Sequence, residues 1–338
     1  MNELKEVIIE LTKQCNLSCI HCGSGCERVL RKDELSIKRW KGLISELSEM
    51  KVKKIVFSGG EPTLKPGLGE LLVFAHSLGI KVGFISNGFL AFSRPLQEAI
   101  SQSCPFAIGL SIDGLKKTHN IVRGNKDSWK RLMKNISILQ EIGVQICAVS
   151  TLHALNHREL PRLASFLEFA EIDSWQLQLA MPSGRMKQRS ELLLGEKDFK
   201  ALCLTVTALR KSHPKLNIQA ADCFGMAPSD SIRSGYWSGC TAGIHSMAID
   251  ACGNVMACLS MQDGGQHENC QERSISEIWK NSIAFDFNRN FQAEQITGKC
   301  KGCDFLSKCR GGCNSQSLAY YGCFHSSPFC FVRSFTHQ

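Results

Sequence analysis

The sequence lacks three features that would place it in a large protein class. No apolar run is long enough to cross a bilayer, so we expect no transmembrane helix and no membrane partner. The N-terminus has no small-residue cleavage site and does not resemble a signal peptide, which favours a cytoplasmic protein. The 40 basic and 31 acidic residues give a net charge of +9, but they form no long basic block, so we expect no nucleic-acid partner.

Cysteine, in contrast, is abundant, with 18 residues in 338. Without a secretory signal, cysteines at this density indicate metal binding and not a disulfide framework. Eleven of them lie after residue 220, and a turn-rich segment covers residues 225–239. We therefore predict a domain over 1–215, a bridging segment over 216–239 and a cysteine-rich domain over 240–338.

The first domain alternates short β-rich runs with amphipathic helical stretches. The runs cover 6–11, 54–58, 80–86, 106–112, 144–151 and 174–179. The helical stretches cover 37–50, 68–78, 95–101, 128–142, 158–170 and 196–211. Six β–α repeats predict an α/β fold, a partial (β/α)6 TIM-like barrel, whose chemistry would lie at the carboxyl ends of the strands.

Three cysteines follow the first run with the spacing C-x3-C-x2-C, at Cys15, Cys19 and Cys22. Three thiolates on one loop can hold three irons of a cubane cluster and leave the fourth iron open to a ligand. A zinc site is the alternative, with Cys26 as its fourth ligand, and ordinary buried cysteines are a third interpretation.

Small and polar residues follow the next strands. Two glycines and a carboxylate, Gly59, Gly60 and Glu61, come after the second run, where a ligand's amino group could approach the backbone. The third run ends in Ser86 and Asn87, and the fourth in Ser111. All of them belong to the predicted catalytic edge of the barrel.

These motifs together resemble the radical S-adenosylmethionine (SAM) superfamily, over residues 5–212. The resemblance rests on C-x3-C-x2-C, GGEP, SNG and the segment that runs from Ser111 to Arg123 and Gly124. It implies a [4Fe–4S] cluster on Cys15, Cys19 and Cys22 that binds SAM. The implied SAM contacts are His21, Gly59, Gly60, Glu61, Ser86, Asn87, Ser111 and Arg123.

The C-terminal cysteines form a second pattern around a predicted hairpin turn at Gly253 and Asn254. Zinc ribbons are one interpretation, because C-x2-C is a common zinc spacing. The pattern also resembles the SPASM domain, whose short helix matches residues 274–279. That resemblance implies an outer auxiliary [4Fe–4S] cluster and an inner one. The outer ligands would be Cys300, Cys303, Cys309 and Cys330, and the inner ligands Cys240, Cys258 and Cys313.

Two ligand positions stay open. The inner set has Ser246 where fuller versions of the pattern have a cysteine. Its fourth position is therefore an open iron, a noncysteine ligand or Cys252. For the outer set, Cys323 is the alternative to Cys330.

Three further residues are candidates for substrate chemistry. Cys223 could donate a hydrogen atom and Asp222 could act as a base, although both also suit ordinary packing roles. Arg185 could bind a substrate carboxylate or form a structural salt bridge.

The resemblance implies an enzyme that uses SAM and three [4Fe–4S] clusters, with an electron donor such as flavodoxin or ferredoxin. SPASM-bearing relatives mostly modify peptides or proteins by cross-linking, epimerisation or oxidation, so we expect such a substrate. A sugar, cyclitol or tetrapyrrole is the small-molecule alternative, and a noncatalytic iron–sulfur or zinc module the alternative of another class. Only 14 residues precede Cys15, so we expect no leader-binding domain and a separate leader-peptide carrier or direct recognition.

Overall fold

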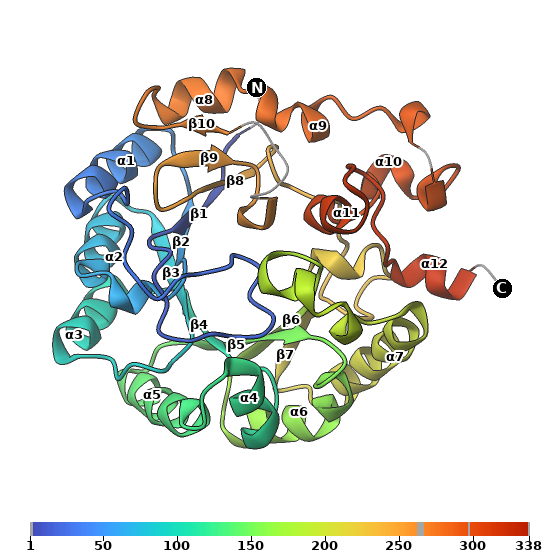
Figure 1. Cartoon of the computed structure of the whole chain (residues 1–338), viewed down its shortest axis with the longest axis horizontal. Helices are drawn as coiled ribbons and strands as arrows, with labels where there is room; N and C mark the ends of the chain where they lie inside the picture. The colour runs from blue at the N-terminus through green and yellow to red at the C-terminus, as the bar shows by residue number, and fades with distance from the viewer. Residues whose placement is uncertain (1–2, 262–266, 297, 337–338) are drawn as a thin grey trace.

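The computed structural model describes residues 3–261, 267–296 and 298–336, which surround one curved β-sheet (Figure 1). Within these ranges the sheet has ten strands in the order β10-β9-β8-β1-β2-β3-β4-β5-β6-β7. Strands β1 to β7 are parallel neighbours. Their bounds are Glu6–Glu10, Lys54–Ser58, Lys81–Ser86, Ala107–Ser111, Ile146–Leu152, Ser174–Leu179 and Asn217–Ala220.

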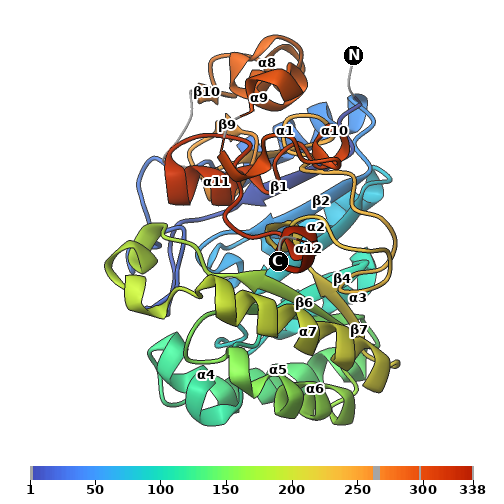
Figure 2. The ribbon, with the colours of Figure 1, turned by 90° about the vertical axis from the view of Figure 1, so that its right-hand side faces the viewer.

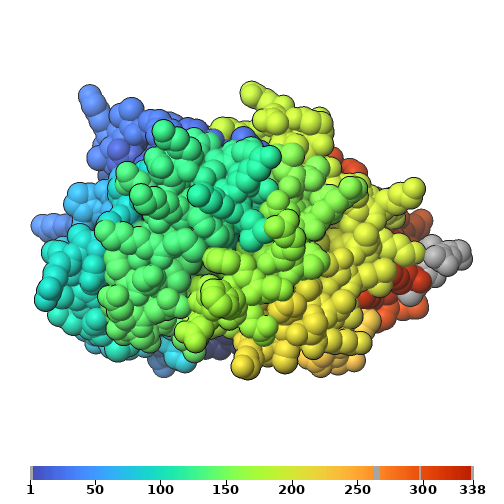
Figure 3. All heavy atoms as spheres, turned by 90° about the horizontal axis from the view of Figure 1, so that it is seen from below, coloured from blue at the N-terminus to red at the C-terminus, as the bar shows by residue number. Residues whose placement is uncertain are grey.

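Helices follow each of the first six strands and cover the outside of the sheet (Figure 1). Helices α1 to α7 cover Ile37–Glu49, Leu68–Ser77, Arg94–Ser103, Lys116–Arg123, Ser128–Ile142, Leu160–Phe169 and Glu196–Ser212. Seen from below, this part of the chain forms one continuous surface that ends at the C-terminal elements (Figure 3). None of the described helices is long and apolar enough to cross a membrane.

Helix α1 shows why these segments fold as they do. Ser36 caps its N-terminus, because the Ser36 side chain accepts a hydrogen bond from the backbone N–H of Arg39. Trp40, Leu43 and Ile44 follow at helical spacing and are completely buried against the sheet. Burial of each such side chain stabilises the fold by about 1.5–3 kcal/mol.

The predicted α/β partial barrel is confirmed, and all six predicted strands and helices are present within two residues or so of their expected ends. Two elements were not predicted. Strand β7 has four residues with two buried positions, too short a pattern to stand out. Helix α4 is mostly polar, and its buried face carries His119 and Arg123 beside Val122.

The C-terminal part extends the barrel sheet. Strand β8 (Ser246–Ile249) pairs in parallel with β1, and β9 (Asn254–Met256) and β10 (Glu268–Asn269) follow as antiparallel neighbours. The predicted hairpin is therefore present, and the sheet continues across the boundaries predicted at residues 215 and 239.

Five helices complete this part: α8 to α12, at Ile275–Asn281, Asp286–Arg289, Leu306–Cys309, Asn314–Tyr321 and Phe331–Thr336. Helix α8 begins at a capping box in which Ser274 and Glu277 exchange hydrogen bonds, and it packs against α1. Helix α12 packs against α7, at the far side of the barrel opening (Figure 2). The C-terminal part thus spans from the first helix of the barrel to its last.

Candidate active site

A cavity of about 200 Å³ lies where the loop after β1 meets the ends of β2 to β5. This is the edge at which parallel β/α folds carry their chemistry. The three cysteines of the first motif line it, together with seven of the eight predicted SAM contacts. These seven are His21, Gly59, Gly60, Ser86, Asn87, Ser111 and Arg123.

Two glycines let the loop after β2 lie directly on the backbone before Cys15. A Cβ atom on Gly59 would be 2.5 Å from the Thr12 carbonyl oxygen, and one on Gly60 would be 2.2 Å from the Gln14 carbonyl oxygen. The Gly60 N–H also donates to the Thr12 carbonyl over 2.7 Å. These positions require glycine because any side chain would push the two loops apart.

Glu61 is completely buried and, unlike its neighbours, does not line this cavity. Its carboxylate accepts hydrogen bonds from the Thr63 hydroxyl (2.6 Å), the Ser86 hydroxyl (2.8 Å) and the Asn87 N–H (2.7 Å). Burial raises the pKa of this carboxyl, against the effect of these donors. Glu61 therefore joins the loop after β2 to the end of β3, and its expected contact with the SAM amino group stays a prediction.

Two side chains point N–H groups at the cysteine sulfurs. Asn87 Nδ2 is 3.7 Å from Cys15 Sγ, and Arg123 Nη1 is 3.5 Å from Cys19 Sγ. Burial raises the pKa of Cys15 to about 11 and also raises that of Cys19. Both thiols thus keep their protons until a metal displaces them, and the N–H groups then stabilise the thiolates.

Cys26 also lines this cavity and packs with the cysteines of the motif. A hydrogen bond between the two thiols lowers the pKa of Cys22 to about 5, and the same bond, together with burial, raises that of Cys26. The structure thus brings Cys26 together with Cys15, Cys19 and Cys22.

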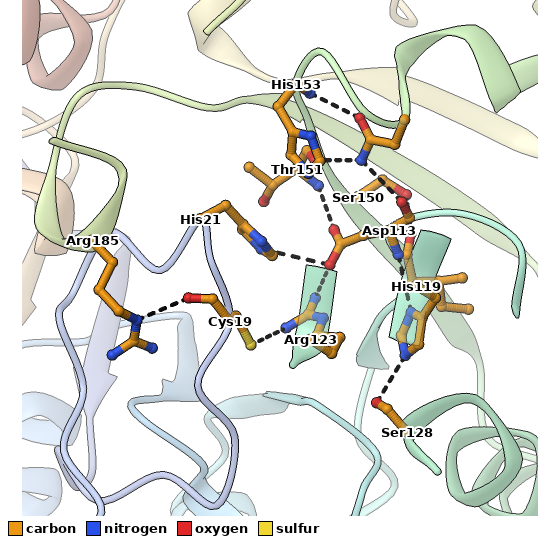
Figure 4. A network of polar contacts seen from close by, with 12 residues as sticks. Cys19, His21, Asp113, His119, Arg123, Ser128, Ser150, Thr151, His153 and Arg185 are labelled. Carbon is orange, nitrogen blue, oxygen red and sulfur yellow. Dashed lines mark hydrogen bonds and ion pairs between the residues drawn. The ribbon is translucent and has the colours of Figure 1, made fainter. Parts of the chain in front are cut away.

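Asp113 is the hub of the polar network shown in Figure 4. Its carboxylate lies 2.6 Å from Arg123 Nη2 and 3.5 Å from His21 Nε2, and it accepts the Thr151 N–H over 2.9 Å. Burial alone would raise the pKa of Asp113, but the charge of Arg123 and the smaller effects of the nearby histidines and of the Thr151 N–H together lower it to about 2. Asp113 is therefore a carboxylate at neutral pH that holds Arg123 against Cys19.

His21 is neutral at physiological pH, because burial lowers its pKa to about 4 despite the nearby Asp113 charge. Its ring centroid lies 5.8 Å from that of His153, which is also buried. His21, the residue just before Cys22, therefore presents an uncharged imidazole ring to the cavity.

Arg185 lines the cavity but binds the protein backbone. Its Nε donates to the Cys19 carbonyl over 2.8 Å (Figure 4), and its Nη1 donates to the Cys26 carbonyl over 3.0 Å. The loop after β6 thus holds the cysteine loop in place. The salt bridge considered for Arg185 from the sequence is replaced by these contacts.

Sequence reasoning assigned no role to Asp113, Thr151 or His153. Asp113 directly follows the fourth strand, and a carboxylate at that edge was the available signal. Thr151 and His153 lie at the end of β5, where the sequence shows no motif.

Within the described ranges, no three His, Cys, Asp or Glu side chains converge on a single metal ion. A cubane cluster does not need such convergence, because each thiolate binds a different iron. The thiols around the cavity, the N–H donors and the close glycine loops fit a cluster with a small ligand beside it.

The C-terminal part holds a second cavity, of about 360 Å³. Cys300, Cys303, Cys309 and Cys330, the predicted outer ligands, all line it. Arg333 Nη1 lies 3.7 Å from Cys300 Sγ. Cys323 is exposed and does not line this cavity, so the structure brings together the set that contains Cys330.

The predicted inner ligands come from three separate elements. Cys240 precedes β8, Cys258 follows β9, and Cys313 caps the N-terminus of α11. The backbone N–H of Asn314 hydrogen-bonds the Cys240 thiol, and the turn after Cys258 packs against α11. Burial raises the pKa of all three thiols; the charge of Cys258 also raises that of Cys240, and the charge of Cys240 raises that of Cys313.

Cys252 does not join this group. It lies in the turn between β8 and β9, where its thiol contacts Asp33. Strand β9 separates it from Cys258 by about 10 Å at roughly 3.3 Å per residue. The alternative in which Cys252 is the fourth inner ligand is therefore not supported.

Two domain families match this chain. The model described as the radical SAM superfamily matches residues 9–167, and the SPASM model, described as an iron–sulfur cluster-binding domain, matches residues 240–304. The Fe-coproporphyrin III synthase of Methanosarcina barkeri is 26% identical over 96% of this chain and 87% of its own length. The PqqA peptide cyclase of Xanthomonas axonopodis pv. citri is 25% identical over 94% and 84%.

Solved structures share the fold. SuiB of Streptococcus suis bound to S-adenosylmethionine has a TM-score of 0.77 at 21% identity, covering 94% of this chain and 74% of that one. The enzyme anSMEcpe with bound AdoMet has a TM-score of 0.76 at 16% identity, covering 98% and 94%. The cavity, the fold and the domain matches define an iron–sulfur enzyme that uses SAM. The chain carries a radical SAM domain over residues 9–167 and a C-terminal SPASM domain over residues 240–304.

Changing Gly60 to alanine tests the close packing of the two loops. The new Cβ atom would overlap the Gln14 carbonyl, so we expect displacement of the cysteine loop and loss of about four irons per chain. Iron analysis after anaerobic reconstitution measures this loss. Gly195→Ala is the control, because no heavy atom lies within 4 Å of a Cβ at that position. Full iron content in Gly60→Ala would contradict the packing argument.

Asp113→Asn tests how much the ionised Asp113 carboxylate contributes to stability. The lowered pKa of Asp113 means that its ionised form stabilises the folded state above the unfolded pKa and that this contribution is lost as pH falls. We expect wild type to exceed the variant by about 2 kcal/mol in unfolding free energy at pH 7, with the difference shrinking between about pH 5 and pH 2. Urea unfolding at several pH values measures this difference. Glu141→Gln, at an exposed carboxylate, is the control and should show no pH-dependent difference. A difference for Asp113→Asn that does not change with pH would contradict the lowered pKa of Asp113.

Proposed function

We propose that this radical SAM enzyme modifies a peptide or protein and carries three [4Fe–4S] clusters. Cys15, Cys19 and Cys22 would hold the first cluster. When bound, that cluster supplies the electron that cleaves a C–S bond of SAM, which yields the radical that removes hydrogen from substrate. The observation that carries the cluster count is the gathering of seven further thiols at two places in the C-terminal part.

The residues around the first cavity have separate tasks in this proposal. Asn87 and Arg123 would stabilise the thiolates, and Asp113 would keep Arg123 in position. Gly59 and Gly60 would leave room for the SAM amino group, and Ser111 would face its ribose or carboxylate. The surrounding loops would exclude water from a reactive radical.

A peptide substrate is supported by two kinds of relative. The PqqA peptide cyclase aligns with nearly the whole chain, and SuiB has the same fold in a complex with its precursor peptide SuiA. An electron donor such as flavodoxin or ferredoxin, and a separate leader-peptide carrier, belong to the same proposal. We place the reaction in the cytoplasm, where thiols stay reduced.

A tetrapyrrole substrate is the second candidate. The Fe-coproporphyrin III synthase and an AdoMet-dependent heme synthase of Oleidesulfovibrio alaskensis are each 26% identical to the chain. Their alignments cover 96% and 95% of it, so the similarity is not limited to the SAM domain.

The triple variant Cys15→Ala, Cys19→Ala, Cys22→Ala tests the cluster assignment. We expect about 12 irons per chain in reconstituted wild type and about 8 in the variant. With SAM and dithionite under anaerobic conditions, only wild type should form 5′-deoxyadenosine, which chromatography measures. Cys104→Ala, at an exposed thiol that lines neither cavity, is the control. About 4 irons in wild type would rule out three clusters.

Substrate class is tested by two additions to the wild-type reaction. We expect a peptide encoded by a short reading frame beside the gene to raise 5′-deoxyadenosine formation and to change mass. We expect Fe-coproporphyrin III to leave the rate of 5′-deoxyadenosine formation unchanged and to show no shift of its Soret band when the protein is added. Turnover of the porphyrin with no response to the peptide would favour the tetrapyrrole candidate.

A further inference from the structure

An almost completely buried ion pair has no part in the SAM site. Lys65 Nζ lies 2.8 Å from Glu34 Oε2, and the two side chains are 9% and 1% exposed. Because taking two charges out of water is costly, such a pair is weak evidence for a gain in stability. The groups that it connects are therefore more informative than the pair itself.

Glu34 closes the loop that carries the cysteines. Its other carboxylate oxygen, Oε1, accepts the Thr12 hydroxyl over 2.9 Å and the Lys13 N–H over 2.8 Å. Thr12 and Lys13 come just before Cys15, whereas Glu34 comes after the last cysteine of the motif. One carboxylate therefore joins the beginning of the cysteine loop to its end.

Lys65 belongs to the loop after β2. It directly follows the short turn Pro62–Leu64. The same loop contains Gly60, whose N–H donates to the Thr12 carbonyl over 2.7 Å. Neither charged side chain lines the SAM cavity. The two loops are therefore joined at two places: by the backbone hydrogen bond of Gly60 beside the cavity, and by the pair of Glu34 and Lys65 away from it.

Thr12 connects these two contacts. Its carbonyl oxygen accepts the Gly60 N–H, while its hydroxyl donates to Glu34 and accepts the Gln14 N–H over 3.1 Å. Thr12 is completely buried, so it has little freedom to move on its own. A shift of Glu34 would move Thr12, and with it the carbonyl oxygen that lies 2.5 Å from the Cβ that Gly59 lacks.

The two residues considered from the sequence for substrate chemistry lie elsewhere. Asp222 and Cys223 belong to the short turn Asp222–Phe224 after β7, at one edge of the sheet, whereas β1 and β2 are in its interior. The Cys223 sulfur accepts the Leu179 N–H over 3.2 Å, at the end of β6. Their roles as hydrogen donor and base stay predictions, and they have no part in the contacts of Glu34 and Lys65.

We propose that Glu34 and Lys65 are positioning residues for SAM binding. Their ion pair sets the distance between the cysteine loop and the glycine turn after β2. This inference rests on the proposed function, which places the first cluster on the cysteine loop and the SAM amino group beside Gly59 and Gly60. A ligand that binds an iron of the cluster and the backbone of the glycine turn together depends on that distance.

The test compares the full chain with Glu34→Gln, Lys65→Met, the two changes combined, and the conservative variant Lys65→Arg. Glu98→Gln is the matched control, because Glu98 pairs with Arg94 at the surface, where both side chains are exposed. Each protein is reconstituted anaerobically. Iron per chain, Tm and the Kd for radiolabelled SAM in equilibrium dialysis are then measured.

We expect each charge-removing single variant to keep about 12 irons per chain and to bind SAM about tenfold more weakly than wild type. Each should also have a lower Tm, because one buried charge has lost its partner. The double variant should recover the Tm, since no unpaired charge remains. Its SAM binding should stay weak, because the two loops are no longer joined. A purely structural pair would instead give a SAM affinity that recovers together with the Tm.

The remaining variants bound the effect. Lys65→Arg keeps the ion pair and should bind SAM almost as tightly as wild type. Glu98→Gln should match wild type in iron, Tm and Kd, because an exposed pair contributes little.

The inference and the proposed function fail in different ways. If wild type binds SAM and the double variant binds it equally tightly, or both single variants do, the pair has no positioning role and the proposed function stands. If wild type loads iron but binds no SAM, the proposed function fails at its first cluster, and the role of the pair with it.

Discussion

The buried ion pair between Asp113 and Arg123 is the contact on which the geometry of the active site depends. Asp113 follows β4, Arg123 ends α4, and the same carboxylate also holds the backbone of β5 and the ring of His21. Through Arg123 the pair reaches the sulfur of Cys19. Loss of the Asp113 charge would leave Arg123 without its counter-charge in the interior, at a cost of about 2 kcal/mol at neutral pH. One carboxylate thus fixes the loop after β4, the end of β5, the end of α4 and the cysteine loop relative to one another.

The two cavities share an electrostatic design. In each, several cysteine thiols would become negatively charged thiolates when metal is bound. Each also has a guanidinium group within 3.7 Å of one sulfur: Arg123 in the first cavity and Arg333 in the second. Hydrogen bonds to ligand sulfurs raise the reduction potential of iron–sulfur clusters. In the proposed arrangement the protein would therefore have a means of setting the potentials of these two clusters separately.

The barrel strands and the cysteine sets could be predicted because they rest on local signals. A short apolar run marks β2, two-residue alternation marks β6, and fixed spacing marks Cys15, Cys19 and Cys22. Asp113, Thr151 and His153 could not be found in this way, because their roles depend on side chains from other strands that only the folded chain brings near. Strand β7 was missed for a related reason: Asn217–Ala220 gains its strand structure from pairing with β6, not from its own composition. Arg185 shows the same limit, because its partners are carbonyl groups, which the sequence does not distinguish.

The pairing of β8 with β1 has a consequence for motion. Strand β1 leads directly into the cysteine loop, and its other neighbour belongs to the SPASM part. Separating the two parts would require breaking a ladder of backbone hydrogen bonds, so they cannot open like domains joined by a hinge. The position of β8 relative to the strand that leads into the cysteine loop is accordingly set by sheet geometry. Admission of a substrate would then come from movement of loops, such as those after β1 and β6, and not from hinged opening of the two parts.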